Sequence, residues 1–298
     1  MKGWAEHMGN NKTLVIDGMA LLFRHFFATS FRNQFMYNAS GVPTNGVQGM
    51  VRHTLKLVEM LKPERMVITW DMGSETIRNE WFRDYKKNRQ APPEELIPQF
   101  DYVKEVIDDI GFCQTGIKGY EADDLIGTLS QKYDDLVIVS GDRDLLQLLD
   151  GTNDIWLTKK GFTEYNVYTQ SVFEEQYGIH PSQFVDVKAL MGDPGDGYYG
   201  VKGVGEKTAF KLIREHGNIE QLLLNLDKLT PSVRSKIEAD RVSLEMSLRL
   251  AKIITDVPVD INFVETKSPL SINPVDIKSV LDGHNLSISS RYVDSLDL

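Results

Sequence analysis

Three short apolar runs in the first half of the chain each lead into an aspartate. They are residues 13–16 before Asp17, residues 66–70 before Asp71, and residues 136–140 before Asp142. Short continuous apolar runs of this kind are typical of buried β-strands. In an open α/β sheet, ligands bind in the crevice at the carboxyl ends of the strands. If the strands are parallel neighbours, the aspartates therefore converge at one edge of the sheet.

Between these strands, apolar positions recur at helical spacing. Residues 46–61 carry an apolar stripe that ends before Pro63, and residues 94–110 carry another that ends at Gly111. Proline and glycine at such positions terminate helices. Strands that alternate with helices indicate an α/β fold with a mostly parallel, doubly wound sheet. We assign this fold to residues 12–170.

The pattern changes at about residue 171. Residues 171–260 hold several short amphipathic stretches separated by glycine and proline, which predicts an all-helical region. Residues 261–298 are weakly patterned, and we expect them to pack on the core or to be partly disordered. The polar residues 1–11 precede the first strand and are expected to form a disordered tail.

Composition narrows the class of protein. The chain has 298 residues, of which 41% are hydrophobic, enough for one large domain or a domain with an appendage. Its single cysteine, Cys113, excludes an intramolecular disulfide and fits a reducing cytoplasm. No apolar run approaches membrane-spanning length. We therefore expect a cytoplasmic protein without a membrane partner.

Nine carboxylates stand out because they lie in four clusters, at least three of them just after a predicted strand. The clusters are Asp17; Asp71; Glu121, Asp123 and Asp124 with Asp142 and Asp144; and Asp193 with Asp196. Each acid alone has an ordinary explanation, such as a helix cap or a turn. Together they would repel one another unless cations neutralise them, and hard divalent ions, Mg²⁺ first, suit oxygen ligands. Two such ions a few Å apart form a site for phosphodiester hydrolysis.

The net charge of −10 argues by itself against a nucleic-acid-binding protein. A phosphate backbone responds to local charge, however, and two segments are locally basic. Residues 78–89 mix cations with aromatic residues, which could neutralise a phosphate and stack on a base, although a solvated amphipathic helix explains that segment equally well. Residues 201–209 form a glycine-rich turn that opens a helix, where backbone N–H groups favour phosphate; a tight turn with solvated lysines is the alternative.

Taken in order, these segments resemble the 5′–3′ exonuclease domain of bacterial DNA polymerase I and the phage and bacterial flap endonucleases. The resemblance covers about residues 12–255, and the segments that carry it are 15–18 with Arg24, 70–73 with Thr76 and Arg78, 85–89, 119–124, 140–144 and 191–209. It implies a PIN-like 5′ nuclease core with a helical arch at about residues 76–93 and a helix-hairpin-helix at about residues 186–216. The chain length leaves no room for a polymerase module, so the resemblance is to the stand-alone bacterial form.

The resemblance also implies roles for individual residues. The first metal site would be formed by Asp17, Asp71, Glu121 and Asp123, with Asp124 beside it, and the second by Asp142, Asp144, Asp193 and Asp196. The catalytic candidates are Lys86 and Arg89, which would contact the scissile phosphate, with Asp17, Asp71, Asp123 and Asp142. The DNA contacts would come from Arg24, Arg78, Tyr85, Lys86, Arg89, Lys202, Gly203, Gly205 and Lys207.

The implied activity is that of a structure-specific 5′ nuclease, which hydrolyses 5′-flap and 5′-end DNA and RNA primers by a two-metal-ion mechanism in replication and repair. The expected cofactors are two Mg²⁺ ions, which Mn²⁺ could replace, and K⁺ at the helix-hairpin-helix. The expected partners are duplex DNA with a 5′ flap or nick and RNA–DNA primers, bound by a monomer.

Two alternatives stay open. One is a DNA-structure-binding protein of the same fold with negligible turnover, which the full set of acids argues against. The other is a PIN-like ribonuclease, which the glycine-rich segment at residues 201–209 argues against.

Overall fold

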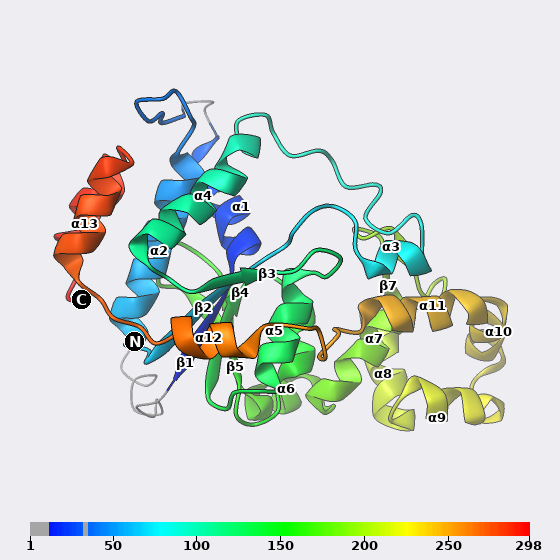
Figure 1. Ribbon diagram of the computed structural model, residues 1–298. Helices are drawn as coiled ribbons and strands as arrows, with labels where there is room; N and C mark the ends of the chain where they lie inside the picture. The colour runs from blue at the N-terminus through cyan, green and yellow to red at the C-terminus, as the bar shows by residue number, and fades with distance from the viewer. Residues whose placement is uncertain (1–11, 32–34) are drawn as a thin grey trace.

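The computed structural model describes residues 12–31 and 35–298 of the chain (Figure 1). The tail expected over residues 1–11 lies outside the described residues. A central sheet lies between two groups of helices, and the helices of residues 184–251 form a lobe at one side of it.

The central sheet has six strands in the order β3-β2-β1-β4-β5-β6. Their bounds are β1 Thr13–Asp17, β2 Arg65–Trp70, β3 Gln114–Gly116, β4 Leu136–Ser140, β5 Asp154–Thr158 and β6 Tyr165–Tyr168. The first five strands are parallel to their neighbours, and β6 is antiparallel to β5. The mostly parallel sheet is therefore confirmed. The strand order reverses between β1 and β4, which is where ligands bind in sheets of this kind.

Side chains of the central strands alternate between two hydrophobic cores. In β1, Leu14 and Ile16 belong to one core and Val15 belongs to the other, and all three are fully buried. Successive residues of a strand point to opposite faces, so a strand that is covered on both faces must be apolar throughout. This explains why the strands read as continuous apolar runs in the sequence.

One face of the sheet is covered by helices from both ends of the chain. These are α1 Gly18–Thr29, α2 Asn45–Leu61, α4 Ile97–Ile110, α13 Pro274–Gly283 and α14 Ser287–Val293. Ile277 and Leu281 of α13 are buried in the same core as α1 and α2. The Gln48 side chain of α2 accepts hydrogen bonds from the backbone of Ile288 and Ser289 at 3.1 and 3.2 Å. The C-terminal helices α13 and α14 are thus packed on the helices that cover this face.

The other face is covered by α5 (Ala122–Ser130) and, continuous with it, by the helical second half of the chain. The helices there are α6 Gln170–Tyr177, α7 Phe184–Met191, α8 Glu206–His216, α9 Ile219–Leu224, α10 Pro231–Ala239, α11 Arg241–Ala251 and α12 Ile261–Lys267. Leu125 of α5, Leu190 of α7 and Ile213 of α8 share one buried core with Val15 of the sheet. The helical region is therefore packed into the same body as the sheet.

The expectation of a helical arch over residues 76–93 is wrong in its secondary structure. Within that segment the only helix is α3 (Ile77–Trp81), and turns and extended chain follow it up to α4. Lys86 has a positive φ of 56°, which an α-helix does not accommodate, and Pro92 and Pro93 prevent the chain from resuming one.

Among the described residues, no helix is both long and apolar enough to cross a membrane.

Candidate active site

Four acids meet at the carboxyl edge of the sheet, at the point where the strand order reverses. Asp17 ends β1, Asp71 follows β2, and Asp142 follows β4, which brings the three aspartates together as the sequence predicts. Asp123 joins them from the first turn of α5. We call Asp17, Asp71, Asp123 and Asp142 the inner carboxylates.

The inner carboxylates interact with one another and lack a cationic partner. None of them forms a salt bridge with a lysine or arginine of the described chain. Burial and the charge of Asp71 raise the pKa of Asp17 to about 7, although Ala20 N and Ser140 Oγ donate hydrogen bonds to its carboxylate. Burial and the neighbouring charge of Asp142 raise the pKa of Asp123 well above its usual value. A cation from outside the protein would therefore favour the ionised forms of Asp17 and Asp123.

A second set of acids is neutralised by the protein itself. We call Glu121, Asp144, Asp193 and Asp196 the outer carboxylates. Glu121 Oε1 accepts a hydrogen bond from Lys86 Nζ at 2.6 Å, and Asp196 Oδ1 accepts one from Arg89 Nε at 3.1 Å. The remaining two, Asp144 and Asp193, share one lysine, Lys188, which is described below. Each outer carboxylate thus has a basic side chain within salt-bridge distance.

Lys188 is a site residue that sequence reasoning missed. Its Nζ lies 2.8 Å from Asp144 Oδ1 and 3.0 Å from Asp193 Oδ2. These two acids raise the pKa of Lys188 despite its burial. The only sequence signal was a lysine in the last turn of the predicted helix that precedes Asp193, and nothing in that pattern shows which acids it meets.

Two of the expected site residues have a different role, and we correct them here. Arg78, which was expected to contact DNA, is 2% exposed, and its guanidinium donates two hydrogen bonds to Asp124 at 2.7 and 2.8 Å. It also donates to the backbone carbonyls of Leu250 and Lys252. Asp124, which was expected beside the first metal, is completely buried, and both of its oxygens are used by Arg78. The buried Arg78–Asp124 pair thus connects α3, α5 and the end of α11 in the protein interior.

Tyr85 is also placed differently from the expectation of a DNA contact. Its ring is 4% exposed and stacks on Tyr198, so it presents no face to a nucleotide base. Its hydroxyl lies 3.3 Å from both Glu121 Oε2 and Asp196 Oδ2. Tyr85 therefore links two outer carboxylates through a hydrogen-bonding group.

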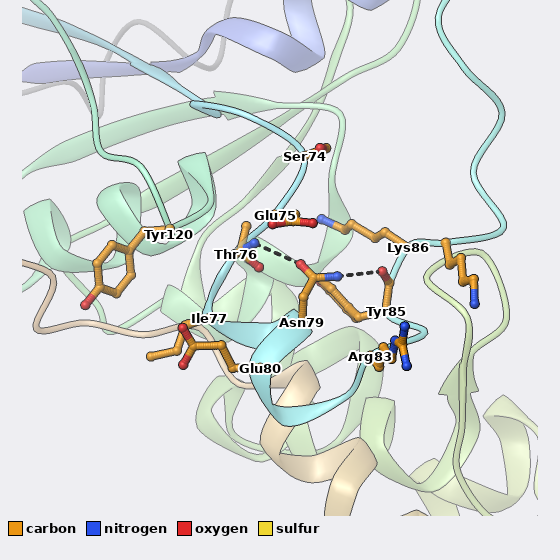
Figure 2. A pocket seen from close by; sticks show the side chains of 12 residues that line it. Ser74, Glu75, Thr76, Ile77, Asn79, Glu80, Arg83, Tyr85, Lys86 and Tyr120 are labelled. Carbon is orange, nitrogen blue, oxygen red and sulfur yellow. Dashed lines mark hydrogen bonds between the residues drawn. The ribbon is translucent and has the colours of Figure 1, made fainter.

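The segment that carries Lys86 is held against the turn after β7 (Gly192–Asp193). Lys86 N donates to Asp196 O at 2.7 Å, which stabilises the left-handed backbone of Lys86. Asn79 supports this segment from α3, because its side chain accepts from Thr76 N at 2.8 Å and donates to Tyr85 O at 3.0 Å (Figure 2).

A wide cleft of about 820 Å³ opens beside Lys86. It is lined on one side by α3 and the preceding residues, including Thr76 and Glu80, and on another by Tyr120 at the start of the α5 segment (Figure 2). The cleft is open, and Lys86 and Lys87 both line it.

The glycine-rich segment lies between α7 and α8, after the hairpin of β7 and β8 (Tyr198–Tyr199). Lys202, Gly203, Gly205 and Lys207 are exposed, and no side chain caps α8 among the described residues. Gly203 has a φ of +75°, a conformation that favours glycine. Arg24 lies apart from this segment, on α1, and donates to Lys159 O at 2.7 Å.

Whether the acids suit a metal depends on their spacing as well as their chemistry. Among the described residues, the ligand atoms that cluster within 4.8 Å of one another belong to a remote group, Glu105, Asp109 and His284, in which His284 Nε2 already lies 2.7 Å from Asp109 Oδ2. No three of the inner carboxylates have ligand oxygens that all lie within 4.8 Å of one another in the described part of the chain. Their all-oxygen donor set and lack of a protein cation fit a hard divalent ion, which would remove their mutual repulsion.

A parallel sheet with an acid-lined edge, a basic segment above it and an exposed glycine-rich turn beside it defines a nuclease that hydrolyses phosphodiesters. Two family models match the chain: "5′-3′ exonuclease, N-terminal resolvase-like domain" over residues 12–178, and "5′-3′ exonuclease, C-terminal SAM fold" over residues 179–275. The chain belongs to the 5′–3′ exonuclease family.

Individual relatives agree with this assignment. A 5′–3′ exonuclease of Bacillus subtilis is 52% identical over 255 residues, which cover 85% of this chain and 86% of the relative. DNA polymerase I of Lactococcus lactis subsp. cremoris is 38% identical over 263 residues, which cover 86% of this chain but 30% of that protein. The solved structure of the phage T5 D15 flap endonuclease with DNA and metal ions has a TM-score of 0.66 at 22% identity, over 96% of this chain and 98% of that chain, and supports the fold.

The buried pair of Arg78 and Asp124 generates a prediction about stability. Arg78→Met should lower the free energy of unfolding by about 3–5 kcal/mol, because it leaves the Asp124 carboxylate buried without its partner. Urea denaturation measures the change. Arg234→Met is the matched control, since Arg234 pairs with Glu238 at the exposed surface and its loss should leave the stability nearly unchanged. Equal effects in the two variants would show that the buried pair has no special structural role.

Proposed function

We propose that this protein is a structure-specific 5′ nuclease that hydrolyses the phosphodiesters of 5′-flap and 5′-end DNA, and of RNA primers paired with DNA. The observation that carries the proposal is the uncompensated group of inner carboxylates, placed at the carboxyl edge of the sheet beside a lysine that reaches the same site. Family membership supports 5′–3′ polarity, and the relatives described above support DNA as the substrate.

The inner and outer carboxylates would hold two divalent ions, Mg²⁺ in the cell with Mn²⁺ as a substitute. Asp17, Asp71 and Asp123 would serve the first ion with Glu121, and Asp142 would join Asp144, Asp193 and Asp196 in serving the second. When bound, such ions stabilise charge on the phosphate and activate the attacking water. The protein's contribution is to hold these oxygens together at one edge of the sheet, where Asp17 is buried and Asp123 is half-buried.

Lys86 and Arg89 would neutralise the scissile phosphate. Their present partners are Glu121 and Asp196, so both cations already lie at the boundary between the two sets of acids. Glu121 and Asp196 raise the pKa of Lys86 despite its burial, and a phosphate oxygen would replace Glu121 as the anionic partner that keeps the lysine charged. This exchange would also free Glu121 for an ion. A fixed cation aimed at developing negative charge stabilises the transition state.

The duplex would dock on the exposed segment formed by Lys202, Gly203, Gly205 and Lys207. The uncapped N-terminus of α8 offers backbone N–H groups to a phosphate, and K⁺ at the turn would add positive charge. Contacts to the backbone position DNA without reading its sequence. Arg24 would add a further phosphate contact from α1, and the protein would act as a monomer.

Cleavage of a 5′-flapped duplex tests the proposal. Wild-type protein with Mg²⁺ should release the flap near its junction, and Asp142→Asn should lower the rate by about 100-fold or more, because it removes an inner carboxylate. Asp282→Asn, on the exposed surface of α13, is the control. Wild-type rates in Asp142→Asn would refute the site assignment. Flap binding without cleavage by the wild type would favour the DNA-structure-binding alternative, and preference for single-stranded RNA would favour the ribonuclease.

Lys86 and its neighbour Lys87 allow a sharper test of the phosphate contact. Lys86→Ala should lower kcat by about 10- to 100-fold and leave duplex affinity nearly unchanged, because its charge acts at the scissile phosphate. Lys87→Ala should leave kcat unchanged, since the Lys87 side chain is 71% exposed and pairs with Asp84 outside the acid cluster. Single-turnover rates and equilibrium binding separate the two effects. Loss of affinity without loss of kcat in Lys86→Ala would contradict its catalytic role.

Metal binding should depend on pH. Burial and Asp71 raise the pKa of Asp17 to about 7, so at pH 6 this carboxyl is mostly protonated and must lose a proton before it can bind an ion. Affinity for Mg²⁺ should therefore rise about tenfold between pH 6 and pH 8. Calorimetric titration at both pH values measures this rise. A flat response would show that no inner carboxylate changes its protonation when the ion binds.

A further inference from the structure

Apart from Arg78, which lies 3.9 Å from Glu121 but is held by Asp124, Lys188 is the most enclosed cation that contacts the outer carboxylates. Its side chain is 16% exposed, compared with 23% for Lys86 and 55% for Arg89. One ammonium contacts two carboxylates from different parts of the chain, Asp144 at 2.8 Å and Asp193 at 3.0 Å. Asp144 belongs to the 3₁₀ helix Arg143–Leu148 after β4, whereas Asp193 belongs to the hairpin after α7. Lys188 therefore joins the sheet side of the site to the helical side.

The local backbone explains how Asp193 comes to lie over Lys188. Gly192 ends α7 with a φ of 71°, which reverses the chain directly after the helix. A Cβ at Gly192 would lie 2.3 Å from Gly200 N, so no other residue would let the two strands of the hairpin approach in this way. The reversal returns Asp193 toward the helix turn that carries Lys188. The contact is thus built into the backbone and does not depend on a flexible surface chain.

Both oxygens of Asp193 are engaged within the protein. Oδ1 accepts from Gly195 N at 2.9 Å and from Asp196 N at 3.2 Å, and Oδ2 accepts from Lys188. Asp144 has the same lysine on its Oδ1. A divalent ion that bridges Asp144 Oδ1 and Asp193 Oδ2 would therefore compete with the ammonium for the same two oxygens. The inner carboxylates have no such competitor, because no described lysine or arginine forms a salt bridge with them.

We propose that Lys188 is the built-in counter-ion of Asp144 and Asp193, and that a divalent ion binds to these acids only by displacing it. Lys188 is a positioning residue in this proposal: it keeps the two acids together while no ion is present, and it raises the ion concentration that the outer carboxylates require. The inference rests on the proposed function, which assigns Asp144 and Asp193 to a metal site.

The test compares Mn²⁺ binding, measured by electron paramagnetic resonance, in metal-stripped wild type and Lys188→Met. Without the competing ammonium, the ions that depend on Asp144 and Asp193 should bind at least about fivefold more tightly. Lys188→Arg keeps the charge and should bind Mn²⁺ nearly as the wild type does. Lys188→Gln is a second neutral variant, which serves if the methionine variant fails to fold.

Lys12 provides a matched control far from the acids. Its Nζ lies 3.2 Å from Asp154 Oδ2, its side chain is 12% exposed, and it precedes β1 at the opposite edge of the sheet. Lys12→Met removes a comparable ion pair and should leave Mn²⁺ affinity unchanged. In EDTA, Lys188→Met should melt at a lower temperature than the wild type, because its two acids repel each other, and Mn²⁺ should raise its Tm by more than it raises that of Lys12→Met.

The outcomes separate the inference from the proposed function. If Asp144→Asn binds as many Mn²⁺ ions as the wild type with the same affinity, the outer carboxylates hold no ion, and the assignment of the second site fails together with the inference. If Asp144→Asn loses an ion but both neutral variants at Lys188 bind Mn²⁺ as the wild type does, or more weakly, the proposed function stands and the displacement of Lys188 is refuted.

Discussion

Electrostatic repulsion among acids at one edge of a parallel sheet is the constraint around which this molecule is arranged. The parallel pairing of β1 with β2 and β4 brings Asp17, Asp71 and Asp142 to the same edge, and burial raises the free energy of keeping Asp17 ionised. The repulsion between these acids can be relieved in two ways. The outer carboxylates are paired with lysine and arginine, whereas the inner carboxylates are left for a cation from solution.

The division between the two sets follows the architecture. The inner carboxylates come from the carboxyl edge of the sheet and from α5, and no described lysine or arginine forms a salt bridge with them. The outer carboxylates border the helical region, whose α7 supplies Lys188, and the segment after α3, which supplies Lys86 and Arg89. Because α5, α7 and α8 share one core with the sheet, the second half of the chain holds these pairs at a fixed distance from the inner set. A site of this kind exists only when both halves are packed together.

Three residues that were expected to act at the site have a structural role in the interior instead. Arg78 and Asp124 are charged residues in segments that carry other candidate site residues, and both were expected at the site. In the structure they neutralise each other in the interior and join three parts of the chain. Tyr85 was expected to meet a nucleotide, but its hydroxyl links Glu121 and Asp196 while its ring fills the space beside Tyr198. Charge and aromaticity in a sequence indicate where chemistry is possible, and burial decides which of these residues solvent and substrate can reach.

The sequence by itself determined the elements and the inner carboxylates. Apolar runs that end in aspartate specify buried parallel strands, and the carboxyl ends of such strands must face one crevice, so Asp17, Asp71 and Asp142 could be placed together without coordinates. The tertiary structure decided three further features: the replacement of the arch by one short helix, the packing of α13 on α4 and of α14 on α2, and the pairing of Lys188 with Asp144 and Asp193. The physical reason is that ion pairs and packing between distant segments depend on which side chains share a buried space. The periodicity of a segment predicts the secondary structure of that segment alone. It does not show which distant segment or side chain will pack against it.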